Sequence, residues 1–287
     1  MTCNTLRYTL LLCCLALAAS LVRADDSTEV WRPAFNLTTV DLGHASVLDS
    51  YLTPITYGGV TVGVGHDMGR ATCFAPERWT NRAHISAEYA YVENGARNNE
   101  MHVLMGNLRY AMTHRWTDVL TPGLTLSVGP AAALRGGIVY NAANSNNVVS
   151  ARIHGNLGAL ALASYGVHIG RLPITLSYQA HLPVLGAFFS PEYDESYYEI
   201  YLGNRRNLAH LGWWGNRFDL DHTLAADLHL GNVLLRVGYH GRIERTWVNN
   251  INTHLTTHAV TIGIGGDWLS VGRHRTLDGR KVVNAGY

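Results

Sequence analysis

The sequence has little charge and, beyond its N-terminus, no long apolar segment. Charged side chains make up 15% of the 287 residues, against roughly 25% in ordinary soluble domains. The chain contains a single lysine, Lys281. Its formal net charge of +1 gives no electrostatic preference for nucleic acid or for acidic partners. The shortage of charge argues against an ordinary soluble domain of this size.

Cysteine is too scarce to hold the fold together. Cys3, Cys13 and Cys14 lie within the first 24 residues, which leaves Cys73 alone in the rest of the chain. We therefore expect neither a disulfide framework nor a cysteine metal cluster.

The N-terminus has the pattern of a secretory signal peptide. Arg7 supplies a positive charge, residues 9–22 form an apolar core, and Ala24 ends a small-residue cleavage site. We expect cleavage after Ala24 and a mature chain that begins at Asp25. The apolar core is short for a transmembrane helix, and no other apolar run approaches the ~18 residues that such a helix needs.

The sequence is rich in a two-residue alternation of apolar with small or polar side chains. Residues 60–65 read Val-Thr-Val-Gly-Val-Gly, and residues 174–182, 235–240 and 260–265 alternate in the same way. Because successive side chains of a strand point to opposite faces, each segment has one apolar face and one polar face. An apolar face toward lipid and a polar face toward a lumen are typical of an outer-membrane β-barrel.

The alternation and the turn residues predict ten strands. Their lengths exceed the roughly 5–6 residues of soluble sheets and reach the roughly 9–11 needed to cross a bilayer. We predict an all-β, closed antiparallel barrel over residues 25–270, after the signal peptide (1–24) and before a C-terminal tail (271–287); two further strands within 196–216 would give twelve. The expected strands are 35–47, 58–70, 82–93, 101–117, 123–140, 150–168, 173–187, 217–229, 232–247 and 256–269.

The connections indicate how the barrel is oriented. Tight turns are expected at 121–123, 170–173 and 230–232, and longer polar links at 94–100, 141–149, 190–216 and 249–255. Short periplasmic turns and longer external loops alternate in outer-membrane barrels, so both termini are expected in the periplasm. The 71–81 connection is longer than this rule predicts.

Three segments carry a family resemblance. Residues 47–54 read Val-Leu-Asp-Ser-Tyr-Leu-Thr-Pro, residues 139–147 read Val-Tyr-Asn-Ala-Ala-Asn-Ser-Asn-Asn, and residues 189–200 read Phe-Ser-Pro-Glu-Tyr-Asp-Glu-Ser-Tyr-Tyr-Glu-Ile. They resemble an uncharacterised domain-of-unknown-function family of secreted, barrel-like proteins common in Bacteroidales. The resemblance implies a signal peptide and an envelope location. It implies no activity and no catalytic residues, and the tail after Ser270 departs from barrels that end on their last strand.

The alternation places both acidic and basic side chains on the predicted inner face. Because unpaired buried charge is costly, we expect these residues to meet across a narrow lumen as hydrogen-bonded pairs that fill it. A ligand site or a conduction pathway lined by the same residues is the alternative. The predicted inner set is His84, Ser86, Glu88, Arg152, His154, Asn156, Gln179, His181, Asp221, Asp227, Arg236, His240, Arg242, Glu244 and Asp267.

Two kinds of histidine chemistry are weighed against this structural interpretation. His84 and Ser86, with Asn94 downstream, resemble the His-x-Ser…Asn arrangement of an outer-membrane phospholipase. The alternation turns His84 and Ser86 toward the lumen, however, away from acyl chains. Histidine pairs such as His254/His258 lack the convergent ligand set that zinc requires, so neither a metal nor a cofactor is predicted.

Acidic residues in the longest loop would suit an omptin-type protease. Asp194, Glu195 and Glu199 precede His210 in the 190–216 link. A solvated acidic loop explains the same residues more simply. An enzyme is therefore the less favoured class.

The 190–216 link is far longer than the 2–5 residues of a simple hairpin loop. It is rich in Tyr, Trp and Arg, which dominate binding hot spots. We expect either an external cap that binds a glycan, a lipid or a protein, or a lid folded into the barrel mouth. The candidate residues are Tyr193, Asp194, Tyr197, Tyr198, Glu199, Arg205, Arg206, Trp213 and Trp214.

These patterns together predict an integral barrel of the bacterial outer membrane, in contact with outer-membrane lipid and without a nucleic-acid partner. Its role would be structural, ligand-binding or minor transport. A barrel hydrolase, of the phospholipase or protease kind, and a soluble periplasmic lipid-binding barrel are the alternatives.

Overall fold

The computed structural model describes residues 30–144, 147–193, 195–203, 206–231, 233–268 and 281–286. The predicted signal peptide, most of the predicted tail, Asp194 and Arg205 lie outside the described residues.

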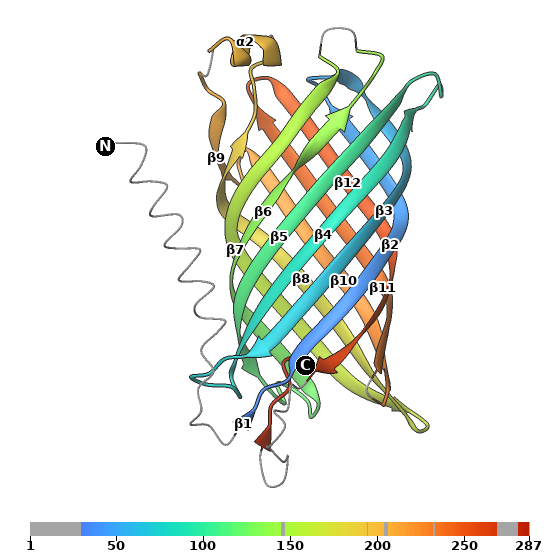
Figure 1. Ribbon diagram of the computed structural model, residues 1–287, viewed down its shortest axis with the longest axis vertical. Helices are drawn as coiled ribbons and strands as arrows, with labels where there is room; N and C mark the ends of the chain where they lie inside the picture. Colours follow the sequence, from blue (N-terminus) through green and yellow to red (C-terminus); the bar gives the residue numbers. More distant parts are fainter. Residues whose placement is uncertain are drawn as a thin grey trace, which may run out of the picture.

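The wall of the molecule is a closed antiparallel β-barrel, as predicted (Figure 1). Each strand pairs with the next along the chain, and the last pairs with the first, which closes the sheet. The wall strands are β2 (Ala34–Asp49), β3 (Thr53–Ala71), β4 (Trp79–Asn94), β5 (Glu100–Trp116), β6 (Leu124–Tyr140), β7 (Val149–Ile169), β8 (Leu172–Phe189), β10 (Arg217–Leu230), β11 (Val233–Val248) and β12 (Ile251–Trp268).

The wall strand that contains β10 is interrupted and includes a further short segment, β9 (Ala209–Trp213). β8 pairs with β10 through residues 174–181 and with β9 through residues 185–189, both antiparallel. β9 and β10 therefore run in the same direction along β8 and form one strand with a bulge between them. The Trp214 indole in that bulge donates to the Pro183 carbonyl at 2.7 Å. The 196–216 segment thus adds no strands to the ring of ten.

Three small elements complete the described fold. The helix α2 (Tyr197–Tyr201) lies in the longest connection, and β1 (Val30–Trp31) pairs in parallel with β13 (Lys281–Val282) at the opposite end of the barrel. We call these the α2 end and the terminal end (Figure 1). No helix among the described residues is long and apolar enough to cross a membrane.

The outer face of the wall is apolar, as the alternation predicts. Val60, Leu42 and Val260 are 66%, 57% and 56% exposed. Their chain neighbours, such as Thr61 and Thr261, point inward and are buried. Exposed apolar side chains on adjacent strands are typical of membrane β-barrels.

The connections follow the predicted alternation of lengths only in part. The expected long link at 249–255 was wrong, because Asn249 and Asn250 form a tight turn and β12 begins at Ile251. Both asparagines have positive φ, 53° and 60°, a conformation that asparagine adopts more readily than most residues. At the terminal end, residues 117–123 form a longer connection than the expected tight turn.

Apolar side chains fill the α2 end of the lumen, although the alternation predicts a polar inner face there. The cluster comes from β2 to β6 and β12, and it includes fully buried Tyr57, Met101 and Leu255. A smaller apolar cluster, with Phe35, Leu37, Leu234 and Ala285, lies at the terminal end. The two clusters leave the charged residues in the stretch of lumen between them.

Candidate functional site in the barrel lumen

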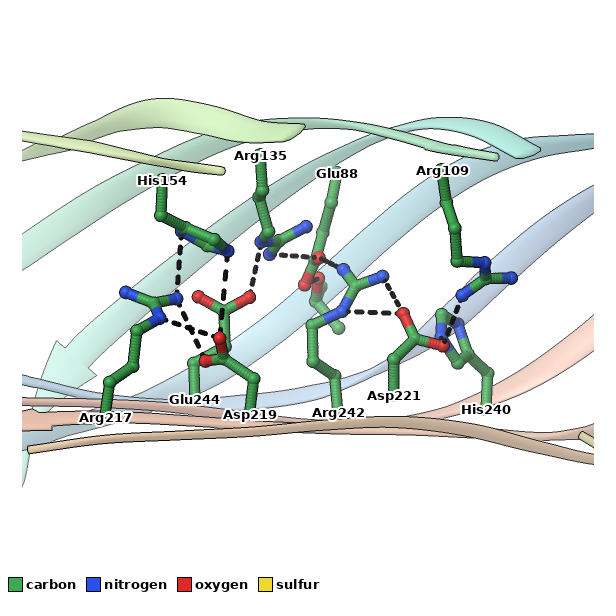
Figure 2. Close-up of polar contacts among 11 residues, drawn as sticks. Glu88, Arg109, Arg135, His154, Arg217, Asp219, Asp221, His240, Arg242 and Glu244 are labelled. Atoms are coloured by element: carbon green, nitrogen blue, oxygen red, sulfur yellow. Dashed lines mark hydrogen bonds and ion pairs between the residues drawn. The ribbon is translucent and has the colours of Figure 1, made fainter. Parts of the chain in front are cut away.

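A band of ion pairs crosses the lumen (Figure 2). One row of side chains comes from neighbouring strands β4 to β7, and the facing row comes from β10 and β11. The first row is Glu88, Arg109, Arg135 and His154; the second is Arg217, Asp219, Asp221, His240, Arg242 and Glu244.

Arg242 and Arg135 bind the centre of the band from opposite walls. Arg242 donates from Nη1 to Glu88 Oε2 at 2.9 Å and from Nε to Asp221 Oδ2 at 3.0 Å. Arg135 Nη2 donates to the same Glu88 oxygen at 3.2 Å, and its Nε pairs with Glu244. Both guanidinium groups are buried, with Arg135 3% and Arg242 4% exposed. Glu88 is thus shared by two arginines from different walls.

The band extends toward the α2 end through Arg217. Its guanidinium donates to both oxygens of Asp219, at 2.7 and 2.9 Å. Its Nη2 also lies 2.9 Å from Nδ1 of His154, across the lumen. Such two-point pairs fix geometry as well as charge.

Toward the terminal end the band continues through His240. Its Nδ1 lies 2.8 Å from Asp41 Oδ2, and its Nε2 lies 3.5 Å from Asp221 Oδ1. Arg109 also lies 3.5 Å from Asp221. His240 therefore sits between two carboxylates.

Charges in the band balance without a ligand. Four arginines (109, 135, 217 and 242) are matched by four carboxylates (88, 219, 221 and 244). His240 has Asp41 as a further partner. The arrangement pairs buried charges and hydrogen-bonds them, which is what makes them tolerable in a narrow interior.

Other predicted inner residues form separate pairs along the lumen. His84 Nδ1 lies 2.9 Å from Asp67 Oδ1, so its partner is Asp67 and not Ser86. Arg236 binds Asp227 through two contacts of 2.7 Å. Arg152 pairs with Asp49 at 3.2 Å. Among the other predicted members, Asn156, Gln179 and His181 are buried or half-buried, whereas Asp267 is exposed near the end of β12.

Several members of the band were missed from the sequence. Arg109, Arg135, Arg217, Asp219 and Asp41 all point into the lumen and pair with oppositely charged residues of the band. The same alternation could have identified them, since each follows the inward parity of its strand.

Small cavities lie beside the band among the described residues. Three of them have volumes of about 30, 40 and 40 Å³, which is room for a few water molecules. Two of them share Asp67, His84, Arg109, Gln179 and Arg236 as lining, on the side of the band toward the terminal end. The cavities are too small for a larger solute.

The 190–216 link closes the α2 end of the lumen. Tyr51 donates from its hydroxyl to the Glu195 carbonyl at 2.8 Å and packs edge-on against Tyr197. The Tyr197 hydroxyl accepts from the Ala151 amide at 2.6 Å. Burial raises the pKa of both tyrosines, so both hydroxyls stay protonated. This part of the link, which we call the cap, is therefore a lid that folds onto the apolar core.

Other predicted loop residues face away from the barrel. Tyr193 and Tyr198 are 58% and 68% exposed, and Arg206 is also exposed. Glu199 forms a capping box with Ser196 at the start of α2, and hydrogen bonds from Ser196 lower the pKa of its carboxyl. Trp213 and Trp214 belong to β9 and its bulge and not to the cap.

The described part of the tail closes the terminal end. Arg82 donates to the carbonyls of Ala285 and Gly286 at 3.0 and 3.2 Å, and Arg115 donates to that of Asn284 at 3.0 Å. Ala285 is fully buried. Residues 283–286 therefore lie in the barrel mouth, held mainly through their backbone.

In the described part of the chain, no group of three or more His, Cys, Asp or Glu side chains is arranged to hold a metal ion.

The fold and the filled lumen define an outer-membrane-type β-barrel with a network of paired charges inside. The sequence matches the profile of the family described as "Protein of unknown function (DUF3316)" over residues 8–275. The chain belongs to this DUF3316 family, which confirms the predicted resemblance; its distribution among Bacteroidales stays a prediction.

Several solved barrels are similar in outline. The transport unit of the autotransporter AIDA-I from Escherichia coli is 9% identical, covers 89% of this chain and 96% of its own, and has a TM-score of 0.46. The outer membrane protease OmpT from Escherichia coli is 7% identical, with 82% and 97% covered and a TM-score of 0.42. The translocator domain of the autotransporter NalP from Neisseria meningitidis is 11% identical, with 91% and 97% covered and a TM-score of 0.33. No curated protein sequence matches significantly. These values support no functional inference.

Proposed function

We propose that this protein is a closed barrel of the bacterial outer membrane that anchors a folded cap at the cell surface and does not conduct solutes. In this proposal the segment before Asp25 is removed on secretion, the α2 end faces outward and the terminal end faces the periplasm. Contact between the apolar wall and membrane lipid would hold the barrel in place.

The observation that carries the proposal is the filled lumen. Arg135 and Arg242 reach from opposite walls to the same carboxylate, Glu88. Moving a solute past them would require breaking buried ion pairs, which is costly. Tyr197 at one end and Ala285 at the other add closures made of packed, hydrogen-bonded chain.

The cap supplies the surface that such an anchor would present. Tyr198 and Tyr201 on α2 are 68% and 81% exposed, and Tyr193 and Leu202 beside the helix are 58% and 65% exposed. Exposed tyrosines on a rigid support suit recognition of a glycan or a protein. A structural role without a ligand would need no such exposure.

The geometry favours this proposal over the enzyme alternatives. His84 is paired with Asp67, so the phospholipase-like arrangement with Ser86 is not assembled. Glu195 is buried, Glu199 caps α2, and His210 Nε2 contacts the Ser190 carbonyl at 3.1 Å. The described residues of the protease-like set thus have structural partners.

Cysteine labelling in intact cells tests both the membrane location and the orientation. In a Cys73→Ser background, Tyr198→Cys should react with a membrane-impermeant maleimide on intact cells. Thr121→Cys, an exposed residue in a turn at the terminal end, should react only after the outer membrane is permeabilised. Release of the protein by alkaline carbonate without detergent, or the reverse labelling pattern, would refute the proposal.

A further inference from the structure

The outer wall carries a row of histidines on adjacent strands. His222 on β10 lies opposite Gly241 on β11, Gly241 lies opposite His258 on β12, and His258 lies opposite His44 on β2. All three histidines follow the outward parity of their strands. We call His222, His258 and His44 the histidine row.

The glycine in this row lets the neighbouring side chains converge. A Cβ atom at Gly241 would lie 2.5 Å from Nε2 of His222 and 2.8 Å from the Tyr239 hydroxyl. The Tyr239 hydroxyl also hydrogen-bonds to Nδ1 of His258, and the two rings stack with centroids 6.0 Å apart. When the hydroxyl donates to Nδ1, the proton of His258 is on Nε2, which can then donate to an anion.

The outward face around the row carries only basic ionisable groups. On the described outward positions of β10, β11, β12 and β2, the ionisable side chains besides tyrosine are the histidine row, His254 and Arg245. His254 and Arg245 lie opposite each other on β12 and β11. Every Asp and Glu of these four strands points into the lumen or lies on the inward parity. The surface is therefore suited to an anion.

Polar side chains on this wall stand at the edge of an apolar surface. Leu224, Val260 and Leu42, two residues along the same strands toward the terminal end, are 55%, 56% and 57% exposed. Ionisable groups on a lipid-facing surface are costly and point to a function. The row lies in the half of the wall nearer the α2 end, where the outer leaflet would meet it.

We propose that the histidine row, with Tyr239 and Arg245 on the same wall, binds the phosphate groups of anionic lipids in the outer leaflet. The proposal rests on the membrane location given under the proposed function. Charge-assisted hydrogen bonds from imidazole and guanidinium groups are strong contacts for phosphate oxygens. The lipid chains would lie along Leu224, Val260 and Leu42.

A second tyrosine–histidine pair supplies a matched control on another part of the wall. The Tyr89 hydroxyl lies 2.7 Å from Nδ1 of His102, which reproduces the contact between Tyr239 and His258. Here, however, Glu93 and Glu100 flank the pair, and Glu100 lies 3.6 Å from Nε2 of His102. The carboxylates should repel an anionic lipid.

Fluorescence quenching by brominated lipid tests the site. In a Cys73→Ser background, a single cysteine that carries a fluorescent label serves as the reporter. One variant places it at Val60, which lies opposite His44 on the outer wall, and the other places it at Leu104, near His102. The protein is reconstituted in phosphatidylcholine vesicles, and either brominated phosphatidylcholine or brominated phosphatidic acid is added. We expect brominated phosphatidylcholine to quench both reporters. Brominated phosphatidic acid should quench the Val60 reporter with a roughly tenfold preference, about 1.4 kcal/mol.

Substitutions separate binding from general lipid contact. His258→Leu combined with Arg245→Leu should abolish the preference at Val60, whereas His102→Leu should leave it unchanged. His258→Gln keeps a side-chain hydrogen-bond donor, so this variant should retain part of the preference for phosphatidic acid. It also guards against attributing a loss caused by misfolding to the loss of binding.

The possible results discriminate between the two proposals. Equal quenching by both lipids at Val60, with both reporters quenched, would overturn the lipid site and leave the membrane barrel standing. Absence of quenching at both reporters would overturn the membrane location itself. If neither lipid quenched the Val60 reporter while the Leu104 reporter was quenched, a second protein copy would cover the histidine row. This result would also overturn the lipid site.

Discussion

Removing the guanidinium of Arg242 tests whether the paired charges in the lumen stabilise the barrel. Arg242→Met leaves the side chain's volume in place but removes the hydrogen bonds to Glu88 and Asp221. Glu88 keeps Arg135 at 3.2 Å, and Asp221 keeps Arg109 at 3.5 Å. The substitution therefore leaves one uncompensated negative charge in a buried band.

The expected loss follows from that geometry. Removing one partner of a buried ion pair lowers the free energy of unfolding by about 3–5 kcal/mol. Because Arg135 and Arg109 still contact the two carboxylates, we expect Arg242→Met to lie near the lower end, at about 3 kcal/mol. The charge-balanced double variant Arg242→Met with Glu88→Gln should recover part of this loss. Arg171→Met, at an exposed turn, is the control and should change stability by less than about 0.5 kcal/mol.

Urea unfolding of the protein refolded in phospholipid vesicles measures these differences. Tryptophan fluorescence reports the transition, and the midpoint and slope give the free energy of unfolding. An Arg242→Met midpoint equal to that of the parent protein would refute the stabilising role of the band. A double variant less stable than the single variant would refute the charge-balance explanation.

Two further predictions concern the ends of the barrel. A Cβ atom at Gly69 would lie 3.6 Å from that of Ala285, within the range for a disulfide. In a Cys73→Ser background, Gly69→Cys with Ala285→Cys should therefore oxidise spontaneously and resist maleimide; free thiols after mild oxidation would show that the tail lies elsewhere. At the other end, hydrogen bonds from Ser196 lower the pKa of Glu199 in the folded cap, so their stabilising effect on α2 is present above the unfolded pKa and is lost as the pH falls through the folded pKa. Carbon-detected NMR titration should give a higher Glu199 pKa in Ser196→Ala, and an unchanged value would contradict the capping box.

Much of the wall could be predicted from the sequence because the alternation is strong where the outer face is apolar and the inner face is small or polar. Residues 60–65 and 260–265 have this contrast, and they fall within β3 and β12. The signal weakens where both faces are apolar. Met101 and Val103 point inward on β5 beside outward Leu104, so the apolar filling of the α2 end was not visible.

Irregular strand geometry explains two other differences. The bulge at Trp214 breaks the alternation between β9 and β10, so a wall strand was read as part of a loop. The turn at Asn249 and Asn250 was read as a long link, although asparagine adopts the positive φ of a tight hairpin turn more readily than most residues.

The sequence predicted that charged side chains line the lumen, but it did not predict which of them form ion pairs. The inward positions of Glu88, Asp221 and Arg242 follow from alternation along single strands. Their contacts with Arg135 and Arg109 depend on the register between strands around the barrel, which a single sequence does not give. The histidine row depends on the same register and was invisible for the same reason.

Recording the current through planar bilayers that contain the purified, folded protein tests the closed barrel most directly. The ion pairs of Arg242 and Arg135, together with the lid and the tail, predict no steady conductance above that of protein-free bilayers. Stable, reproducible channel openings in protein whose folded state is verified in the same sample would contradict a filled lumen.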